Sequence, residues 1–215
     1  MPVEVELKLN VLDVPAIRGL VLDPGDGLTG VTPIGPARNS EVEDRYVDTS
    51  DRALWSAGLV ARIRTGAGGP RLTVKSAARD GDGAVHRRLE LEGDATEDDP
   101  PGMWPPSPAR DRVVSTVGER PLVALVTLRQ RRLQRDLAVG ASVVELSLDE
   151  IERHGPNGRL DAWTELECEL RTGSEADLAA LGAILARRGD LAPATMSKLE
   201  RALGGSLATT VAGKP

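Results

Sequence analysis

The segment Val3-Glu4-Val5-Glu6-Leu7-Lys8-Leu9 alternates apolar side chains with two acids and a base. A period of two places the three charges on one face of a β-strand and the apolar residues on the other. Such a charged face is typical of a solvated sheet, but it also suits a cavity that holds charges of both signs. The segment alone leaves both interpretations open.

The same alternation recurs along the chain, with its charges sorted by sign. One predicted strand, Leu59–Arg64, carries bases, another, Glu165–Leu170, carries acids, and a third, Arg88–Glu92, mixes them. An ordinary antiparallel sheet has polar residues outside and apolar residues inside, but nothing in it requires sorting by sign. A cavity lined in this way can hold divalent cations on its carboxylates and a polyanion on its arginines and lysines.

Length and composition indicate a single domain. The chain has 215 residues, no phenylalanine and 2% aromatic residues, so its core must be built from Leu, Val, Ile and Ala. The net charge of -6 and the pI of about 5.1 argue against a general nucleic-acid binder. The opening residues lack the basic start and apolar run of a signal peptide, and no apolar run approaches the ~18 residues of a membrane span. We therefore expect a cytoplasmic protein with no membrane partner.

The pattern of predicted elements indicates an α+β fold. Roughly eight strands with helices inserted between them predict an eight-stranded antiparallel β-barrel, with the helices packed outside. Asp13 and Ser174 are predicted N-caps, the first of a short helix over residues 15–20 and the second of a longer helix that ends at Gly189. A charged barrel interior is stable only if metal, phosphate and water occupy it, since buried unpaired charges are very costly. The interior is therefore predicted to be a functional site.

These segments, in this order, resemble the CYTH family, also called triphosphate tunnel metalloenzymes. The resemblance covers residues 3–201. The motifs that carry it are Glu4-x-Glu6-x-Lys8, Tyr46-Val47-Asp48-Thr49, Leu59-Val60-Ala61-Arg62-Ile63-Arg64, Leu72-Thr73-Val74-Lys75, Arg88-x-Glu90-x-Glu92, Arg129-x-Arg131, Asp149, Glu165-x-Glu167-x-Glu169 and Ser197-Lys198. The resemblance implies a closed tunnel within a domain of residues 1–203, followed by a flexible tail or linker over residues 204–215.

The resemblance also implies a divalent metal, Mg²⁺ or Mn²⁺, which prefer hard oxygen ligands. There is no cluster of His and Cys in the sequence to suggest zinc. The implied ligands of the principal cation are Glu4, Glu6, Glu165 and Glu167. Asp149, Glu90 and Glu92 remain for a second metal or for water.

A cradle of basic residues is predicted to bind the triphosphate, because arginine makes two-point contacts with phosphate and lysine acts as a point charge. Its members are Lys8, Arg62, Arg64, Lys75, Arg88, Arg129, Arg131 and Lys198. A register shift of one residue would bring in Arg87 and Arg132 instead. Arg88 and Arg129 could equally pair with neighbouring carboxylates.

The predicted catalytic set is Glu4, Glu6, Lys8 and Tyr46. Tyr46 has two interpretations: a core aromatic with a satisfied hydroxyl, or a residue beside Lys8 that positions water. The family includes inorganic triphosphatases, thiamine triphosphatases, class IV adenylate cyclases and relatives of RNA triphosphatases, and the fold does not choose among them. The scarcity of aromatic residues for stacking favours inorganic triphosphate.

A binding module is the alternative from another class. The segment Ser197–Leu203 is similar to the junction that precedes a helical CHAD domain in some family members, which are associated with polyphosphate. The chain could then be the CYTH part of a longer protein that holds polyphosphate without cleaving it. Many carboxylates favour catalysis instead, since a pure polyanion binder gains little from them. Both a monomer and a homodimer are compatible with the sequence.

Overall fold

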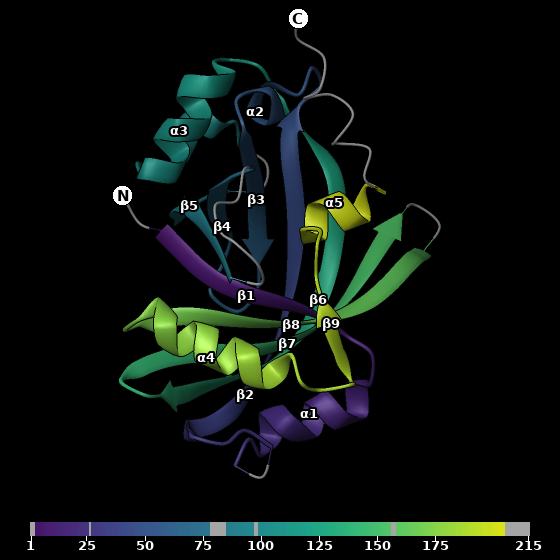
Figure 1. Cartoon of the computed structure of the whole chain (residues 1–215). Coiled ribbons are helices and arrows are strands. Elements are labelled where there is room, and N and C mark those ends of the chain that lie inside the picture. Colours follow the sequence, from purple (N-terminus) through teal and green to yellow (C-terminus); the bar gives the residue numbers. More distant parts are fainter. Residues whose placement is uncertain (1–2, 26, 78–84, 97–98, 156–157, 205–215) are drawn as a thin grey trace, which may run out of the picture.

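The computed structural model describes residues 3–25, 27–77, 85–96, 99–155 and 158–204. Eight antiparallel strands pair in the order β5-β4-β3-β2-β6-β7-β8-β1, and a further pairing of β1 with β5 closes them into a ring (Figure 1). The strands are β1 (Val3–Val11), β2 (Val31–Thr49), β3 (Leu59–Thr65), β4 (Arg71–Ser76), β5 (Val85–Asp94), β6 (Leu122–Val139), β7 (Ser142–Gly155) and β8 (Gly158–Thr172). The predicted eight-stranded antiparallel α+β fold is confirmed.

Short strand β9 (Leu191–Pro193) extends the sheet by pairing with the end of β1. The helices are α1 (Val14–Leu22), α2 (Ala53–Ser56), α3 (Pro108–Val117), α4 (Glu175–Leu185) and α5 (Lys198–Ala202), with a 3₁₀ turn, η1 (Pro101–Met103). Asp13 and Ser174 cap α1 and α4 as predicted, each by accepting a hydrogen bond from a backbone N–H of the first turn. Helix α4 ends at Leu185, earlier than predicted, because the backbone N–H groups of Arg187 and Arg188 donate to carbonyls three residues back, as in a turn.

The alternation of β1 is explained by two different environments. Val5, Leu7 and Leu9 face outward and are buried in an apolar cluster under α1 and α4, which includes Ile17 and Leu181. Glu4, Glu6 and Lys8 occupy the opposite face, and each is no more than 9% exposed. Since both faces are buried, the charged face of β1 is not a solvated sheet surface.

The segment between β5 and β6 packs on the outside of the ring. Trp104 after η1 and Val113 of α3 are buried against Leu72 and Val74 of β4. This second apolar cluster covers the outer face of β3, β4 and β5. The segment between β5 and β6 therefore covers and supports the outer face of these three strands.

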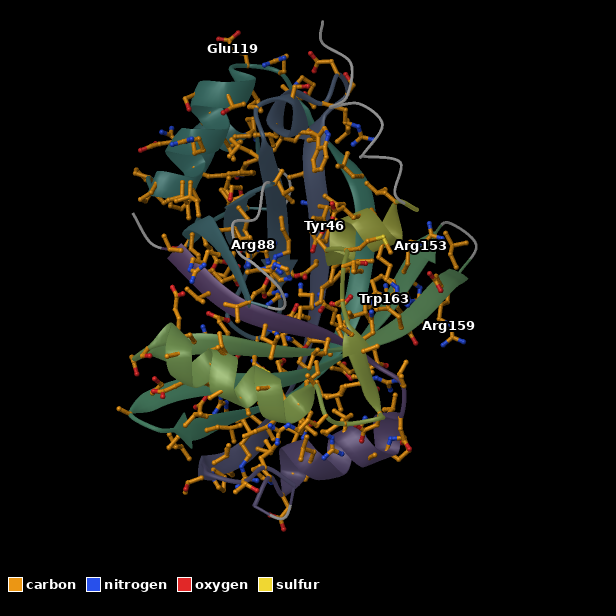
Figure 2. The ribbon with its side chains drawn as sticks, in the orientation of Figure 1. Tyr46, Arg88, Glu119, Arg153, Arg159 and Trp163 are labelled. Carbon is orange, nitrogen blue, oxygen red and sulfur yellow. The ribbon has the colours of Figure 1, made fainter. Side chains whose placement is uncertain are left out.

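Helix α5 closes one end of the ring from within. Leu199 and Ala202 of α5 pack against Tyr46, Leu128 and Trp163, whose side chains share the inward face of their strands. Figure 2 shows Tyr46 and Arg88 inside the molecule, whereas Glu119, Arg153 and Arg159 lie at its periphery. The predicted tail over residues 204–215 lies outside the described residues except for Gly204. Among the described helices, none has the length and apolar character required to cross a bilayer.

Candidate functional site

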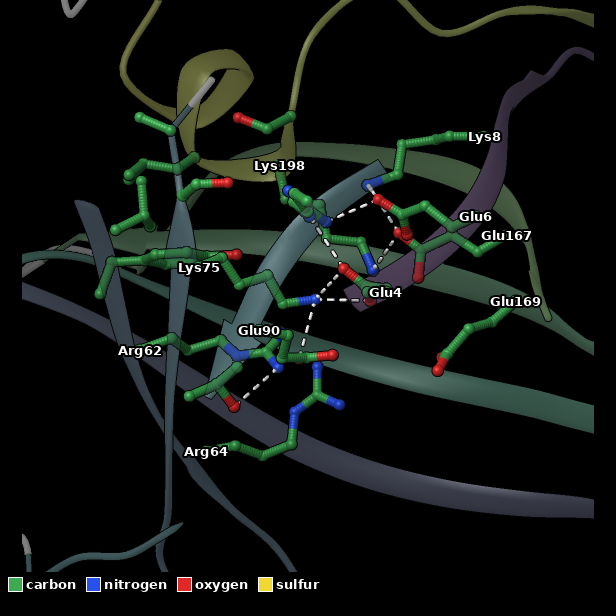
Figure 3. Close-up of a pocket in the computed structure, with 18 of the residues that line it drawn as sticks. Glu4, Glu6, Lys8, Arg62, Arg64, Lys75, Glu90, Glu167, Glu169 and Lys198 are labelled. Atoms are coloured by element: carbon green, nitrogen blue, oxygen red, sulfur yellow. Dashed lines mark hydrogen bonds and ion pairs between the residues drawn. The ribbon is translucent and has the colours of Figure 1, made fainter. Parts of the chain in front are cut away.

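A pocket of about 1100 Å³, including its opening to solvent, lies inside the ring. Acidic and basic side chains from six of the eight ring strands and from α5 reach it. The charged residues that line it are Glu4, Glu6, Lys8, Arg62, Arg64, Lys75, Arg88, Glu90, Glu92, Arg132, Glu167, Glu169, Arg171, Lys198 and Glu200. The structure thus gathers most of the predicted site residues around one space (Figure 3).

The three charges of β1 are paired with bases and acids of its neighbours. Register places Arg88 opposite Glu4 and Glu167 opposite Lys8. Glu4 accepts hydrogen bonds from Lys75 Nζ at 2.6 and 2.7 Å and from Arg88 Nε at 2.8 Å. Glu6 accepts one from Arg88 Nη2 at 2.6 Å, and Lys8 Nζ lies 2.8 Å from Glu167. Each β1 charge therefore already has a partner of opposite sign (Figure 3).

These partners keep Glu4 and Lys8 of β1 in their charged forms. Burial raises the pKa of Glu4, but Lys75 and Arg88 outweigh it and bring the pKa down to about 2. Burial lowers the pKa of Lys8, but Glu167 and Glu6 outweigh it and the pKa is raised. Both groups are therefore charged at neutral pH.

Glu165 and Glu167 of β8 lie in different surroundings. Trp163 Nε1 donates to Glu165 Oε1 at 2.7 Å, while the buried Glu165 Oε2 has no hydrogen-bond partner among the described residues. Burial raises the pKa of Glu165, whereas Lys198 and Lys8 overcome burial at Glu167 and lower its pKa. Lys8 Nζ lies 4.0 Å from Glu165 Oε2, and Glu165, unlike Glu167, does not line the pocket.

Lys198 enters the site from the first residue of α5. A capping box fixes this helix start, because Ser197 accepts from Glu200 N while the Glu200 side chain accepts from Ser197 N. Lys198 Nζ then donates to Asp149 Oδ2 at 2.5 Å and lies 3.2 Å from Glu167. The predicted return of Lys198 to the interior is what the structure has.

Arg132 is the second base on Asp149. Its Nε donates to Asp149 Oδ1 at 2.8 Å, and its Nη2 lies 3.6 Å from Glu167. Burial lowers the pKa of Arg132, but Asp149 and Glu167 outweigh it and the pKa is raised. Asp149 itself is fully buried and does not line the pocket.

The placement of Arg129 and Arg131 inside the ring was wrong by one residue. Their side chains are 63% and 67% exposed and pair with Glu43 and Glu150 on the outer surface. Three of the four residues from 129 to 132 are arginines, so the sequence does not show which of them face inward. The inward face of β6 is Gln130, Arg132 and Gln134, and only Arg132 supplies a base to the pocket. Arg88, by contrast, was placed correctly, and Arg87 pairs with Glu175 on the exterior.

Arg62 and Arg64 of β3 line the pocket as predicted, and an aspartate that the sequence analysis missed lies behind them. Asp44 of β2 accepts from Arg62 Nη1 at 3.2 Å and from Arg64 Nε at 2.6 Å. Asp44 is two residues before Tyr46, so the strand alternation could have placed it on the inner face. Tyr46 is 7% exposed within the apolar cluster of α5 and also lines the pocket, and its role in positioning water stays a prediction.

Acidic residues mark the rim of the pocket. Glu90 Oε1 lies 3.0 Å from Lys75, and the side chain of Glu92 is 58% exposed. Glu169 lines the pocket beside Arg171, whose Nη1 donates to it at 2.5 Å. Burial nevertheless raises the pKa of Glu169 to about 7. The acidic row of β8 therefore continues from the interior to the opening.

The donor set suits a hard divalent cation, because it consists of carboxylates, and one of their oxygens, Glu165 Oε2, accepts no hydrogen bond from the described residues. Within the described residues, no three side chains of Asp, Glu, His or Cys are gathered closely enough to hold a metal ion. The carboxylates are turned toward lysines and arginines instead. A metal bound to these glutamates would have to displace such ion pairs, and the released bases would then face the pocket.

Comparisons with solved structures agree with this fold. A protein from Hippeastrum, HpAC1, provisionally named an adenylyl cyclase and described as having a dominant triphosphatase activity, superposes with a TM-score of 0.68. It is 22% identical, over 94% of this chain and 96% of that one. A provisionally named adenylate cyclase of Bacillus halodurans has a TM-score of 0.57 at 16% identity, over 94% of this chain and 98% of that one. The PH1819 protein of Pyrococcus horikoshii OT3 has a TM-score of 0.54 at 19% identity, over 93% and 98% of the two chains.

These likenesses, all under 25% identity, concern the fold. Comparison of the sequence with curated proteins finds no match. The CYTH domain family, however, matches residues 3–203, which is nearly the whole chain. That match spans the strands that line the pocket and the α5 lysine, and the chain belongs to the CYTH domain family.

Proposed function

We propose that this protein hydrolyses a triphosphate inside the ring in a divalent-metal-dependent reaction, with inorganic triphosphate as the substrate. One observation carries the proposal: seven bases, from β1, β3, β4, β5, β6 and α5, line the same pocket as the glutamates of β1 and β8. Cleavage of a phosphoanhydride needs charge neutralisation on both sides of the scissile bond. The bases proposed to supply it are Lys8, Arg62, Arg64, Lys75, Arg88, Arg132 and Lys198.

The proposed metal ligands are Glu4, Glu6, Glu165 and Glu167, with Glu90 and Glu92 for a second ion or for water. Asp149, which the sequence also offered for a second ion, is fully buried outside the pocket lining and is proposed instead to hold Arg132 and Lys198. A divalent cation held there would neutralise phosphate oxygens and lower the pKa of an attacking water. The arginines would contact phosphate oxygens at two points each, and the lysines would act as point charges. Lys8 and Tyr46 are proposed to orient the water. Mg²⁺ and Mn²⁺ are both compatible with carboxylate ligands.

Inorganic triphosphate needs only charges, which are what the pocket mainly offers. An organic triphosphate is the second candidate, as for a thiamine triphosphatase or a class IV adenylate cyclase, because Trp55 and Val60 line the pocket beside Tyr46. The triphosphatase activity stated for HpAC1 supports hydrolysis over cyclisation. A polyphosphate-binding module without catalysis, with or without a CHAD domain, is supported less well, since it gives no purpose to Glu4, Glu6 and Glu167 in the pocket.

The test is phosphate release from inorganic triphosphate, thiamine triphosphate and ATP, each with Mg²⁺ and Mn²⁺, together with an assay for cyclic AMP. We expect metal-dependent release from inorganic triphosphate and a collapse of turnover in Glu6→Gln with the fold retained. Glu150→Gln is the matched control, because Glu150 pairs with Arg131 on the outer surface. Polyphosphate binding without turnover of any substrate would defeat the enzyme proposal, and an active Glu6→Gln would remove Glu6 from the metal site.

A further inference from the structure

Asp44 is a carboxylate that lies behind the pocket and not in it. Its side chain is 0% exposed, and it does not belong to the residues that line the pocket. It nevertheless accepts from Arg62 Nη1 at 3.2 Å and from Arg64 Nε and Nη2 at 2.6 and 2.8 Å. Both arginines do line the pocket. Asp44 thus connects two proposed phosphate-binding groups without being accessible to a ligand.

The strand register explains this arrangement. Asp44 of β2 is directly opposite Arg64 of β3, and the next inward residue, Tyr46, is opposite Arg62. From the other neighbouring strand, β6, Gln130 Nε2 donates to Asp44 Oδ2. Thr73 Oγ1 accepts from Arg62 Nη2 at 3.3 Å. The aspartate is therefore fixed from both sides, and it fixes the two guanidinium groups in turn.

The glutamates of the site differ from Asp44 in one respect. Glu4, Glu6 and Glu167 line the pocket and form ion pairs that a ligand can reach and exchange. Asp44 cannot be exchanged in this way, because no ligand reaches it. Its contacts take up Nε and Nη2 of Arg64 and leave Nη1 of that arginine out of the pair. A two-point pair of this kind fixes the plane of a guanidinium group as well as its position.

We propose that Asp44 is a positioning residue, which holds Arg62 and Arg64 of β3 in the orientation that contacts triphosphate oxygens. The proposal rests on the phosphate binding put forward above, but not on turnover. The proposed role of Asp44 concerns triphosphate binding alone, so it can be tested with triphosphate in the absence of metal.

Positioning and simple electrostatics predict opposite signs for Asp44→Asn. Removing a negative charge near the binding site of a polyanion lowers the Coulomb repulsion between them, and this effect alone would strengthen binding. Releasing two guanidinium groups from a fixed orientation weakens binding, because a two-point contact with phosphate needs the plane of the guanidinium group in place. The direction of the change therefore decides between the two roles.

The experiment is calorimetric titration of the full chain with inorganic triphosphate in the presence of EDTA. We expect Asp44→Asn to bind about 10- to 100-fold more weakly than the wild type, which corresponds to the loss of about one charge-assisted hydrogen bond. Glu43→Gln is the matched control: it removes one negative charge from the adjacent residue, whose partner Arg129 is on the outer surface. That control should bind like the wild type. Equal or tighter binding by Asp44→Asn overturns the proposal.

A double-mutant comparison separates positioning from a general structural role. In an Arg62→Gln/Arg64→Gln background, adding Asp44→Asn should cause no further loss of triphosphate affinity. A further loss as large as in the wild type would show that Asp44 acts through something else and would overturn the proposal. If Asp44→Asn does not fold, Arg64→Lys gives a second route, since it keeps the charge and loses the two-point pair. Its affinity should fall, and wild-type affinity in that variant overturns the proposal.

The outcomes also separate this inference from the proposed function. Triphosphate binding that depends on Asp44, without turnover in metal, would leave the inference standing and remove the hydrolase. Turnover with no effect of Asp44→Asn on binding would do the reverse. A wild type that does not bind triphosphate would remove the cradle and the role of Asp44 together.

Discussion

Glu4 illustrates how a buried charge is made tolerable inside this ring. The carboxylate accepts three hydrogen bonds from Lys75 and Arg88, and these partners lower its pKa to about 2 despite burial. The sequence predicted which face Glu4 occupies, because alternation fixes faces. It did not predict the partners, because Lys75 and Arg88 come from strands whose register only the folded ring defines.

This pairing predicts a loss of stability in acid. The folded pKa of Glu4 lies below its reference value of 4.5. The contribution of ionised Glu4 to the free energy of unfolding is therefore present above pH 4.5 and is lost as the pH falls from 4.5 toward 2. In EDTA, the free energy of unfolding should fall less steeply over this range in Glu4→Gln than in the wild type, measured by urea unfolding at several pH values. Glu119→Gln, at the periphery of the molecule, should keep the wild-type slope. An unchanged slope in Glu4→Gln would contradict the prediction.

Strands β1 and β6 differ in how much their sequences reveal. In β1 the apolar and charged residues alternate without interruption, so both faces were predicted correctly. In β6 the run Arg129-Gln130-Arg131-Arg132 has no apolar residue to mark the outer face. Its register follows from pairing with β2 and β7, which places Gln130 and Arg132 inward. Local pattern therefore fails where every residue of a segment is polar.

Arg131 and Arg132 of β6 provide a matched pair for testing that register. Arg132→Gln should weaken triphosphate binding, because Arg132 lines the pocket. Arg131→Gln removes the same charge from the adjacent residue, but its side chain is 67% exposed on the other face. It should leave the affinity unchanged at 0.15 M salt, where exposed distant charges are largely screened. Calorimetry with inorganic triphosphate measures the affinity of both variants. A larger loss of affinity in Arg131→Gln than in Arg132→Gln would place Arg131 in the site.

Helix α5 was only half predicted. The resemblance brought Lys198 into the tunnel, and the structure has it there on Asp149. That Leu199 and Ala202 fill one end of the ring could not be predicted, because their partners Leu128, Ile151 and Trp163 lie far away in the sequence. Short helices have little periodicity to interpret, and the packing of a single turn is decided by tertiary contacts.

At the scale of the whole molecule, the apolar core lies mainly outside the ring. One cluster lies under α1 and α4 and another under α3, while the inside is polar except where α5 packs. The sequence predicted an aliphatic core and a charged interior, and both are found. It did not predict that two separate outer clusters support one wall each, since this depends on where the helices dock.

The apolar cluster outside the ring predicts a loss of stability when an apolar side chain of β1 is truncated. Leu7 is 1% exposed in the cluster under α4, so Leu7→Ala should lower the free energy of unfolding by about 2–5 kcal/mol. Leu12→Ala is the control, because Leu12 is 65% exposed and surface changes usually stay within about 0.5 kcal/mol. Urea unfolding followed by tryptophan fluorescence measures both. A loss below about 1 kcal/mol for Leu7→Ala would contradict the burial of this face.

Closure of the ring also sets the order in which the protein can fold. Strand β1 pairs with residues 85–89 on one side and with residues 165–169 on the other. Contacts this far apart along the chain are entropically expensive to form early, and proteins dominated by them fold in roughly milliseconds to seconds. During synthesis, the Glu4-Glu6-Lys8 strand leaves the ribosome long before Glu167 and must wait for it. A chaperone that shelters β1 in this interval would act on the strand whose late pairing with β8 completes the ring.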